Sequence, residues 1–160
     1  MTTLVPAGGR LPDYPPKTPP PPKRPASPPV PDRVLVPLTL AGRRCGTWTL
    51  AELRPWAVRK VCVEIAGRLA KWEHRLTAER RTQLDAIVTT LAEGVIAAGA
   101  RKLSVHLGDR GRQVVILVVG HGAALEPGRD VLRAVAAHRV ASVGTDSTQQ
   151  ECHAWAVIDL

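Results

Sequence analysis

Hydrophobic residues alternate with other residues over 34–40, which is the period of a half-buried strand. Pro37 restricts this strand to an edge or a bulge, because proline has no N–H for a ladder. From Thr49 to Glu52 the chain has the pattern of a capping box, which predicts a helix that runs to about His74. One apolar stripe predicts the buried face of this helix: Val58, Cys62, Ile65, Leu69 and Trp72.

Two more helices and four strands are predicted further along the chain. Thr77 caps the second helix, which ends near Ala98 because Gly99 follows. Its stripe is Leu84, Ile87, Val88, Leu91 and Val95. A strand over 113–119 is almost continuously apolar, so we expect it to be central and covered. The other predicted elements are a strand over 102–107, a loop over 120–127, a short helix over 128–138, strands over 139–143 and 153–158, and a polar loop over 144–151.

This order of elements predicts an α+β domain over residues 33–160. We expect a two-layer α/β sandwich, with a mixed or antiparallel sheet and the helices on one face. Residues 1–32 are different, because they hold twelve of the fifteen prolines. Such a segment is predicted to be a disordered, polyproline-like arm that acts as a tether first and as a docking peptide second.

Composition and charge narrow the classes of function. The net charge of +8 suits an acidic partner, although arginine-rich codon usage explains part of it. Aromatic residues that would stack on bases are missing beside the basic cluster, so nucleic acid is not the expected partner. Neither a membrane span nor a signal peptide is found, and the cytoplasm is the expected location. The three cysteines and five histidines show no metal-binding spacing. We expect His121 to be an exposed loop histidine.

Three stretches resemble the Bergerat-fold ATPases of the histidine-kinase and Hsp90 type. The helix pair over 58–100, the strand 115–119 that leads into Gly120-His121-Gly122, and Gly128-Arg129-Asp130 carry the resemblance, together with Trp155-Ala156-Val157. Within that superfamily the chain is most similar to bacterial anti-sigma-factor serine kinase-like domains. The resemblance implies an ATP and Mg²⁺ pocket, binding to a sigma factor or its antagonist, and homodimer formation.

The chain departs from this family at the residues that do the chemistry. The family's general base and its Asn ligand for Mg²⁺ fall on Thr90 and Gly94. A register slipped by one residue would place Thr89 and Glu93 there instead, and only then would Glu93 be a metal ligand. Gly120 replaces the Asp that accepts the adenine amine, and Asp130 replaces a glycine near the phosphates. The residues of this degenerate nucleotide pocket are Thr90, Glu93, Gly94, Gly120, Gly122, Gly128 and Arg129.

These departures predict no catalytic residue, no bound metal and no cofactor. The favoured hypothesis is a regulatory protein-binding module, a pseudoenzyme that controls transcription through protein contacts. One alternative is an active ATP-dependent serine/threonine kinase of the anti-sigma type, with ATP and Mg²⁺ in a divergent site. A second alternative is a basic nucleic-acid-binding protein.

Overall fold

The computed structural model describes residues 44–123 and 125–160. The predicted arm over 1–32 and the predicted strand over 34–40 lie outside these described residues. The elements are β1 (Arg44–Leu50), α1 (Pro55–Lys71), α2 (Ala78–Ala97), β2 (Lys102–Asp109), β3 (Gln113–His121), α3 (Arg129–Ala136), β4 (Ser142–Ser147) and β5 (Glu151–Asp159).

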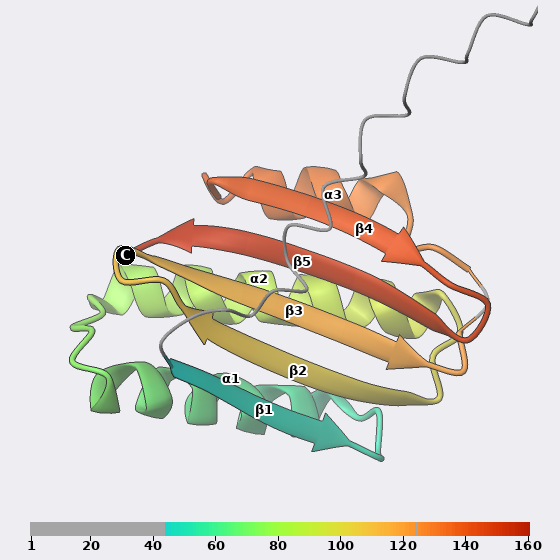
Figure 1. Ribbon diagram of the computed structural model, residues 1–160, viewed down its shortest axis with the longest axis horizontal. Helices are drawn as coiled ribbons and strands as arrows, with labels where there is room; N and C mark the ends of the chain where they lie inside the picture. Colours follow the sequence, from blue (N-terminus) through green and yellow to red (C-terminus); the bar gives the residue numbers. More distant parts are fainter. Residues whose placement is uncertain (1–43, 124) are drawn as a thin grey trace, which may run out of the picture. The chain divides into compact units, whose positions relative to one another are not determined.

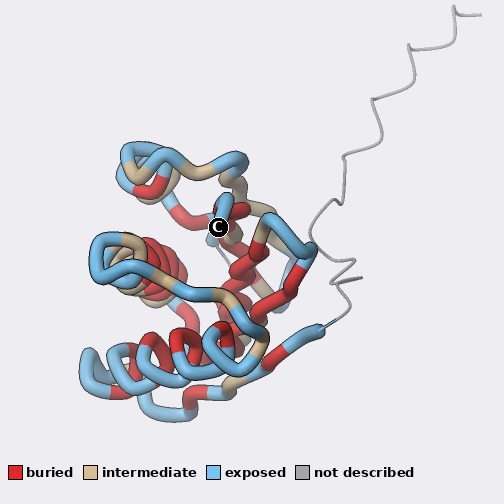
Figure 2. The backbone as a smooth tube through the Cα atoms, turned by 90° about the vertical axis from the view of Figure 1, so that its left-hand side faces the viewer, coloured by how far each residue is buried: buried red, intermediate tan, exposed pale blue. Residues whose placement is uncertain are grey.

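The described strands form one antiparallel sheet in the order β1-β2-β3-β5-β4 (Figure 1). Seen edge-on in Figure 2, the described helices lie together on one side of this sheet. The predicted α+β class with helices on one face is confirmed, and the sheet takes the antiparallel of the two predicted forms. β3 occupies the middle of the sheet and is buried along its length, as its continuous run of apolar residues indicated.

The core lies between the sheet and the helices. The predicted stripe of α1 is buried from Val58 to Leu69, and Trp72, at the end of the helix, is half-buried. All five stripe residues of α2 are buried as well. Gly99 has a φ of +96°, a left-handed conformation that costs glycine little, so the stop after α2 is also confirmed.

The predicted capping box at Thr49 is wrong. Thr49 belongs to β1, where it pairs with Ser104 of β2. The helix begins at Pro55, after an extended Arg54 whose side chain makes no capping hydrogen bond. Proline fits the first helical position because its missing N–H would have no partner there. At the other end, Glu73 has a φ of +69°, so α1 stops before His74.

The predicted polar loop over 144–151 is wrong for most of its length. β4 extends to Ser147 and pairs with β5 through residues such as Thr145 and Asp146. β4 is one of the two edge strands of the described sheet, and it has no fully buried residue. An edge strand of this kind needs little hydrophobic patterning, which is why its sequence is typical of a loop.

Candidate functional site

Gly94 lies on α2, at the position where the resemblance expects the metal ligand. The backbone of α2 there is covered by Val131 of α3, and a Cβ added to Gly94 would lie 2.5 Å from Val131 Cγ2. No real Cβ tolerates such a distance, so the glycine is what allows α3 to approach α2 this closely. An aliphatic side chain therefore fills the space next to the expected metal position, and it offers no oxygen ligand.

Gly120 lies on β3, at the position of the family's adenine-binding Asp. A Cβ there would lie 2.8 Å from Ala100 Cβ and 2.9 Å from Cys152 Sγ, and it would also collide with Val95. These neighbours belong to the hydrophobic core. An acidic side chain has no room at this position, and the surroundings are too apolar to hold a carboxylate without a partner.

The other predicted pocket residues are spread over the surface around these two glycines. Thr90 is half-buried on α2 and Glu93 is exposed one turn later. Gly122 makes the turn after β3 with a φ of +75°, and its amide donates to the Gln150 carbonyl at 2.8 Å. Gly128 and Arg129, both exposed, begin α3.

Asp130 does not face the predicted pocket as a ligand would. Its side chain is 97% exposed, and its carboxylate lies 3.8 Å from the guanidinium of Arg133, one turn along α3. ATP and Mg²⁺ thus do not fit the residues that the resemblance assigns to them. The sequence showed which ligands are missing and predicted that Val95 and Val131 point inward, but it did not show that these two side chains occupy the space of the pocket.

A polar network lies on the other face of the sheet, which we call the outer face. His121 Nε2 lies 2.8 Å from Ser104 Oγ, and His121 Nδ1 lies 2.8 Å from Glu151 Oε1. His153 Nε2 lies 3.4 Å from the second oxygen of Glu151. The expectation of an exposed loop histidine at 121 is therefore wrong, because β3 extends to His121 and pairs it with Glu151. The hydrogen bond with His121 lowers the pKa of Glu151, more than its partial burial raises it.

Ser104, His121 and Glu151 are connected through hydrogen bonds in the same way as the serine, histidine and acid of a hydrolytic triad. The burial of the serine, however, differs from that of a catalytic serine. Ser104 is only 8% exposed, whereas a nucleophilic serine has to present its hydroxyl to the substrate carbonyl. The network links β2, β3 and β5 through side chains as well as through the backbone. We therefore assign it to the stability of the sheet.

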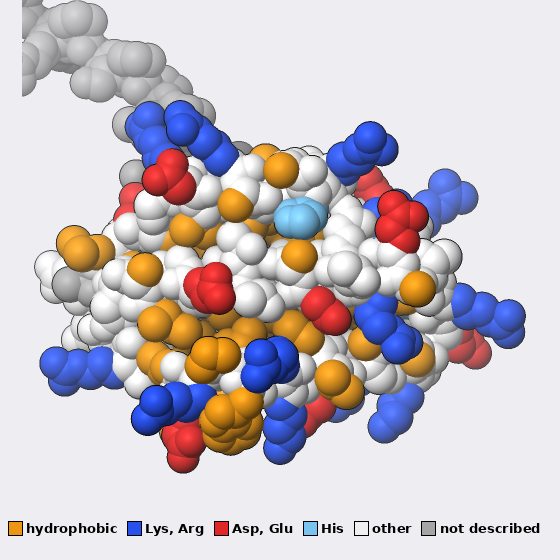
Figure 3. All heavy atoms as spheres, turned by 180° about the vertical axis from the view of Figure 1, so that it is seen from behind, with side chains coloured by type: hydrophobic (Ala, Val, Ile, Leu, Met, Phe, Trp, Pro, Cys, Tyr) orange, Lys and Arg blue, Asp and Glu red, His pale blue; other side chains and the backbone are white. Residues whose placement is uncertain are grey.

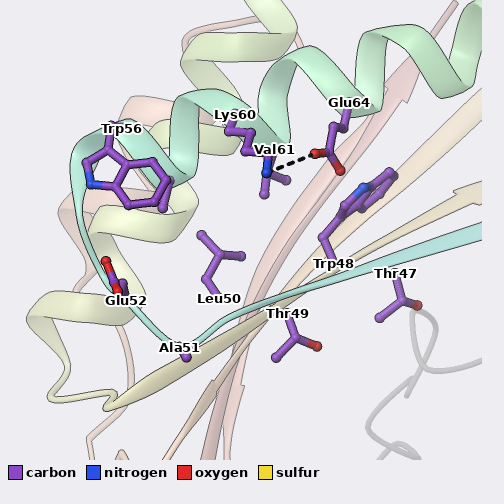
Figure 4. A pocket seen from close by; sticks show the side chains of 11 residues that line it. Thr47, Trp48, Thr49, Leu50, Ala51, Glu52, Trp56, Lys60, Val61 and Glu64 are labelled. Atoms are coloured by element: carbon purple, nitrogen blue, oxygen red, sulfur yellow. Dashed lines mark ion pairs between the residues drawn. The ribbon is translucent and has the colours of Figure 1, made fainter.

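A groove of about 500 Å³ lies between the edge strand β1 and α1. Trp56 and Trp48 lie on either side of Leu50 in this β1–α1 groove, and Lys60 and Glu64 form an ion pair of 4.0 Å above it (Figure 4). Trp56 is 54% exposed, an unusual position for so large an apolar side chain. The groove was not predicted. The signal available in the sequence was a tryptophan directly after the helix-starting Pro55.

The charges on the helix side of the domain are mixed. Lys and Arg side chains project around its rim, and Asp and Glu side chains lie among them (Figure 3). A phosphate backbone would need a continuous basic stripe. Within the described residues no group of three or more His, Cys, Asp and Glu side chains could hold a metal ion. None of the described helices has the length and apolar character needed to span a membrane.

No model of a known protein family matches the chain, and no curated protein matches it in sequence.

Proposed function

We propose that this chain is a regulatory protein-binding module, built on an anti-sigma-kinase-like fold whose nucleotide pocket is closed by its own side chains. The observation that carries the proposal is the packing of Val131 against Gly94. Nucleotide and metal would have to displace α3 from α2 before they could bind. The packing of Gly120 against Val95, Ala100 and Cys152 supports the same proposal from the adenine end.

The partner in this proposal is a protein, and the resemblance suggests a sigma factor or its antagonist, or a second copy of the chain. The net charge of +8 favours an acidic surface on the partner. The β1–α1 groove offers the contact, because tryptophans at the centre of an interface carry a large share of binding energy. β1, beside the groove, is an edge strand of the sheet that the described residues form, and an extended segment of a partner adds to a sheet at such an edge.

Calorimetry of the full chain with ATP, with and without Mg²⁺, tests the closed pocket. We expect no binding at millimolar ATP. Micromolar binding that depends on Mg²⁺ would reject the proposal in favour of the kinase alternative. Glu93→Ala then identifies the ligand: loss of that affinity, with Glu64→Ala unchanged, would assign Mg²⁺ to Glu93.

Binding to purified sigma factors and their antagonists from the same organism tests the partner. We expect Trp56→Ala to weaken the complex about 10- to 100-fold, as loss of a central tryptophan does. Val63→Ala is the matched control, because Val63 is exposed on α1 without lining the groove. Equal affinities for the two variants would exclude the groove, and an absence of binding to every sigma factor and antagonist would exclude this class of partner.

A further inference from the structure

One end of the domain gathers three segments that are far apart in the sequence. β1 begins there, α1 ends there, and the turn between β2 and β3 lies beside them (Figure 1). Two contacts join these segments. A guanidinium nitrogen of Arg44 donates to the Trp72 carbonyl at 2.9 Å, and His74 Nε2 lies 3.2 Å from a carboxylate oxygen of Asp109. The three segments therefore build one surface.

Exposed cations collect on this surface. We call them the basic end: Arg44, Arg68, Lys71, Arg75 and Arg112. Among the described residues, none of these five side chains forms an ion pair with a carboxylate. Cations that are exposed and lack an acidic partner within their own chain attract an anionic group from another molecule.

Carboxylates at the same end offset only part of this charge. Asp109 is 7% exposed, and its carboxylate is already engaged by His74. Glu73, Glu79 and Asp159 are exposed. The cations of the basic end outnumber these exposed carboxylates, so the surface keeps an excess of positive charge.

The basic end continues the β1–α1 groove. The guanidinium carbon of Arg68 lies 6.0 Å from the ring centroid of Trp48, and Trp48 lines the groove. Glu52 and Trp56 lie on the other side of Leu50 (Figure 4). A segment bound in the groove therefore meets a carboxylate at one end and cations at the other, which gives the site a direction.

We propose that the groove and the basic end together bind a partner segment that has an apolar part and an acidic part. The apolar part lies in the groove, between Trp48 and Trp56, and the carboxylates lie against Arg68, Lys71 and Arg75. Arg68 and Lys71 are three residues apart on α1, so they present neighbouring charges to such a segment. The inference rests on the proposed function, because it takes the groove as the contact with the partner.

A protein segment fits this surface better than nucleic acid does. Glu73 and Glu79 interrupt the cations, and a phosphate backbone, which carries a charge at every nucleotide, would meet them. Trp48 and Trp72 adjoin the basic end, but both are half-buried and pack against the core. They offer no platform on which a base could stack.

Fluorescence anisotropy of a labelled synthetic peptide, a run of leucines followed by a run of glutamates, tests the proposal on the full chain. We expect Lys71→Glu combined with Arg75→Glu to weaken binding at least about tenfold, because two attractive contacts become repulsive. Arg101→Glu combined with Lys102→Glu is the matched control. It changes the net charge equally at the opposite end of the sheet, and the affinity should stay the same. All four residues are exposed, so the fold is retained in both variants.

Equal affinities of the two double variants would overturn the proposal, and so would a peptide that does not bind the unaltered chain at millimolar concentration. An unchanged affinity in Trp56→Ala would overturn the position of the apolar part in the groove. A short DNA duplex that binds more tightly than the peptide, and is lost in the basic-end variant, would replace the protein partner by nucleic acid. The peptide needs no sigma factor or antagonist, so peptide binding that follows these expectations supports the inference even where that class of partner is excluded.

Discussion

At positions 94 and 120 the fold requires glycine because neighbouring side chains leave no room for a Cβ, and not because the backbone has a positive φ. At both positions the nearest atoms belong to buried or half-buried aliphatic and cysteine side chains of neighbouring elements. Gly67 is different, because it lies inside α1 with no atom within 4 Å of where a Cβ would be. The same residue type therefore has opposite consequences for stability at these positions.

We expect Gly120→Ala to lower the free energy of unfolding by about 1–3 kcal/mol, because the methyl group would overpack the core. Gly67→Ala should raise it by about 0.5–1 kcal/mol, because glycine is the poorer helix former. Urea denaturation of the two variants measures both effects. A neutral Gly120→Ala would mean that the core around Val95 yields easily and that the adenine position is open.

The sequence alone could show which side chains the nucleotide site lacks, since each is absent at a single position. It could not show what fills the space. Val131 is one of several inward candidates on a short helix, and only the approach of α3 to α2 selects it. Likewise, Ser104 and Glu151 are 17 and 30 residues from His121, so only the sheet register brings them together.

Two threonines, Thr77 and Thr49, begin similar helix-capping patterns in the sequence, but only Thr77 caps a helix in the structure. Thr77 Oγ1 accepts a hydrogen bond of 3.2 Å from the Arg80 amide, as a helix cap does. Thr49 has the same local pattern but is paired within the sheet. The helix stripes and the central strand were predictable because burial imposes a period on them. Thr49 and β4 were not, because long-range pairing overrides local preference.

Thr77→Ala should destabilise the protein by about 1 kcal/mol, since the first turn of α2 loses its capping oxygen. Thr49→Ala is the comparison, because its exposed side chain caps no helix. Thermal unfolding of both variants tests the difference. Equal losses of stability in the two variants would mean that the capping hydrogen bond of Thr77 adds nothing beyond what an uncapped threonine contributes.

For the molecule as a whole, the network around Glu151 links stability to pH. The hydrogen bond with His121 lowers the pKa of Glu151 from its usual 4.5 in the folded state. The folded chain therefore holds this proton less tightly than the unfolded chain. The resulting stability is complete above about pH 4.5 and is lost as the pH falls through the lower, folded pKa.

Glu151→Gln should flatten the loss of stability between neutral pH and about pH 3, as measured by urea unfolding at each pH. Glu64→Gln is the control, because Glu64 lies on the exposed face of α1, where its ion pair with Lys60 is 4.0 Å long. Its profile should follow that of the unaltered chain. A Glu151→Gln profile as steep as the control's would assign the acid sensitivity to other carboxylates.

The central strand β3 makes the chain prone to aggregation before the fold is complete. Its run Val-Val-Ile-Leu-Val-Val has high β-propensity and carries no charge and no proline. Such segments stack into cross-β assemblies when two chains expose them together. In the native sheet β2 and β5 occupy both of its edges. α3 and β4 separate β5 from β3 along the chain, so a nascent or heated molecule exposes one edge of β3 until β5 pairs with it. Aggregation, rather than simple unfolding, is the expected fate of this protein under stress.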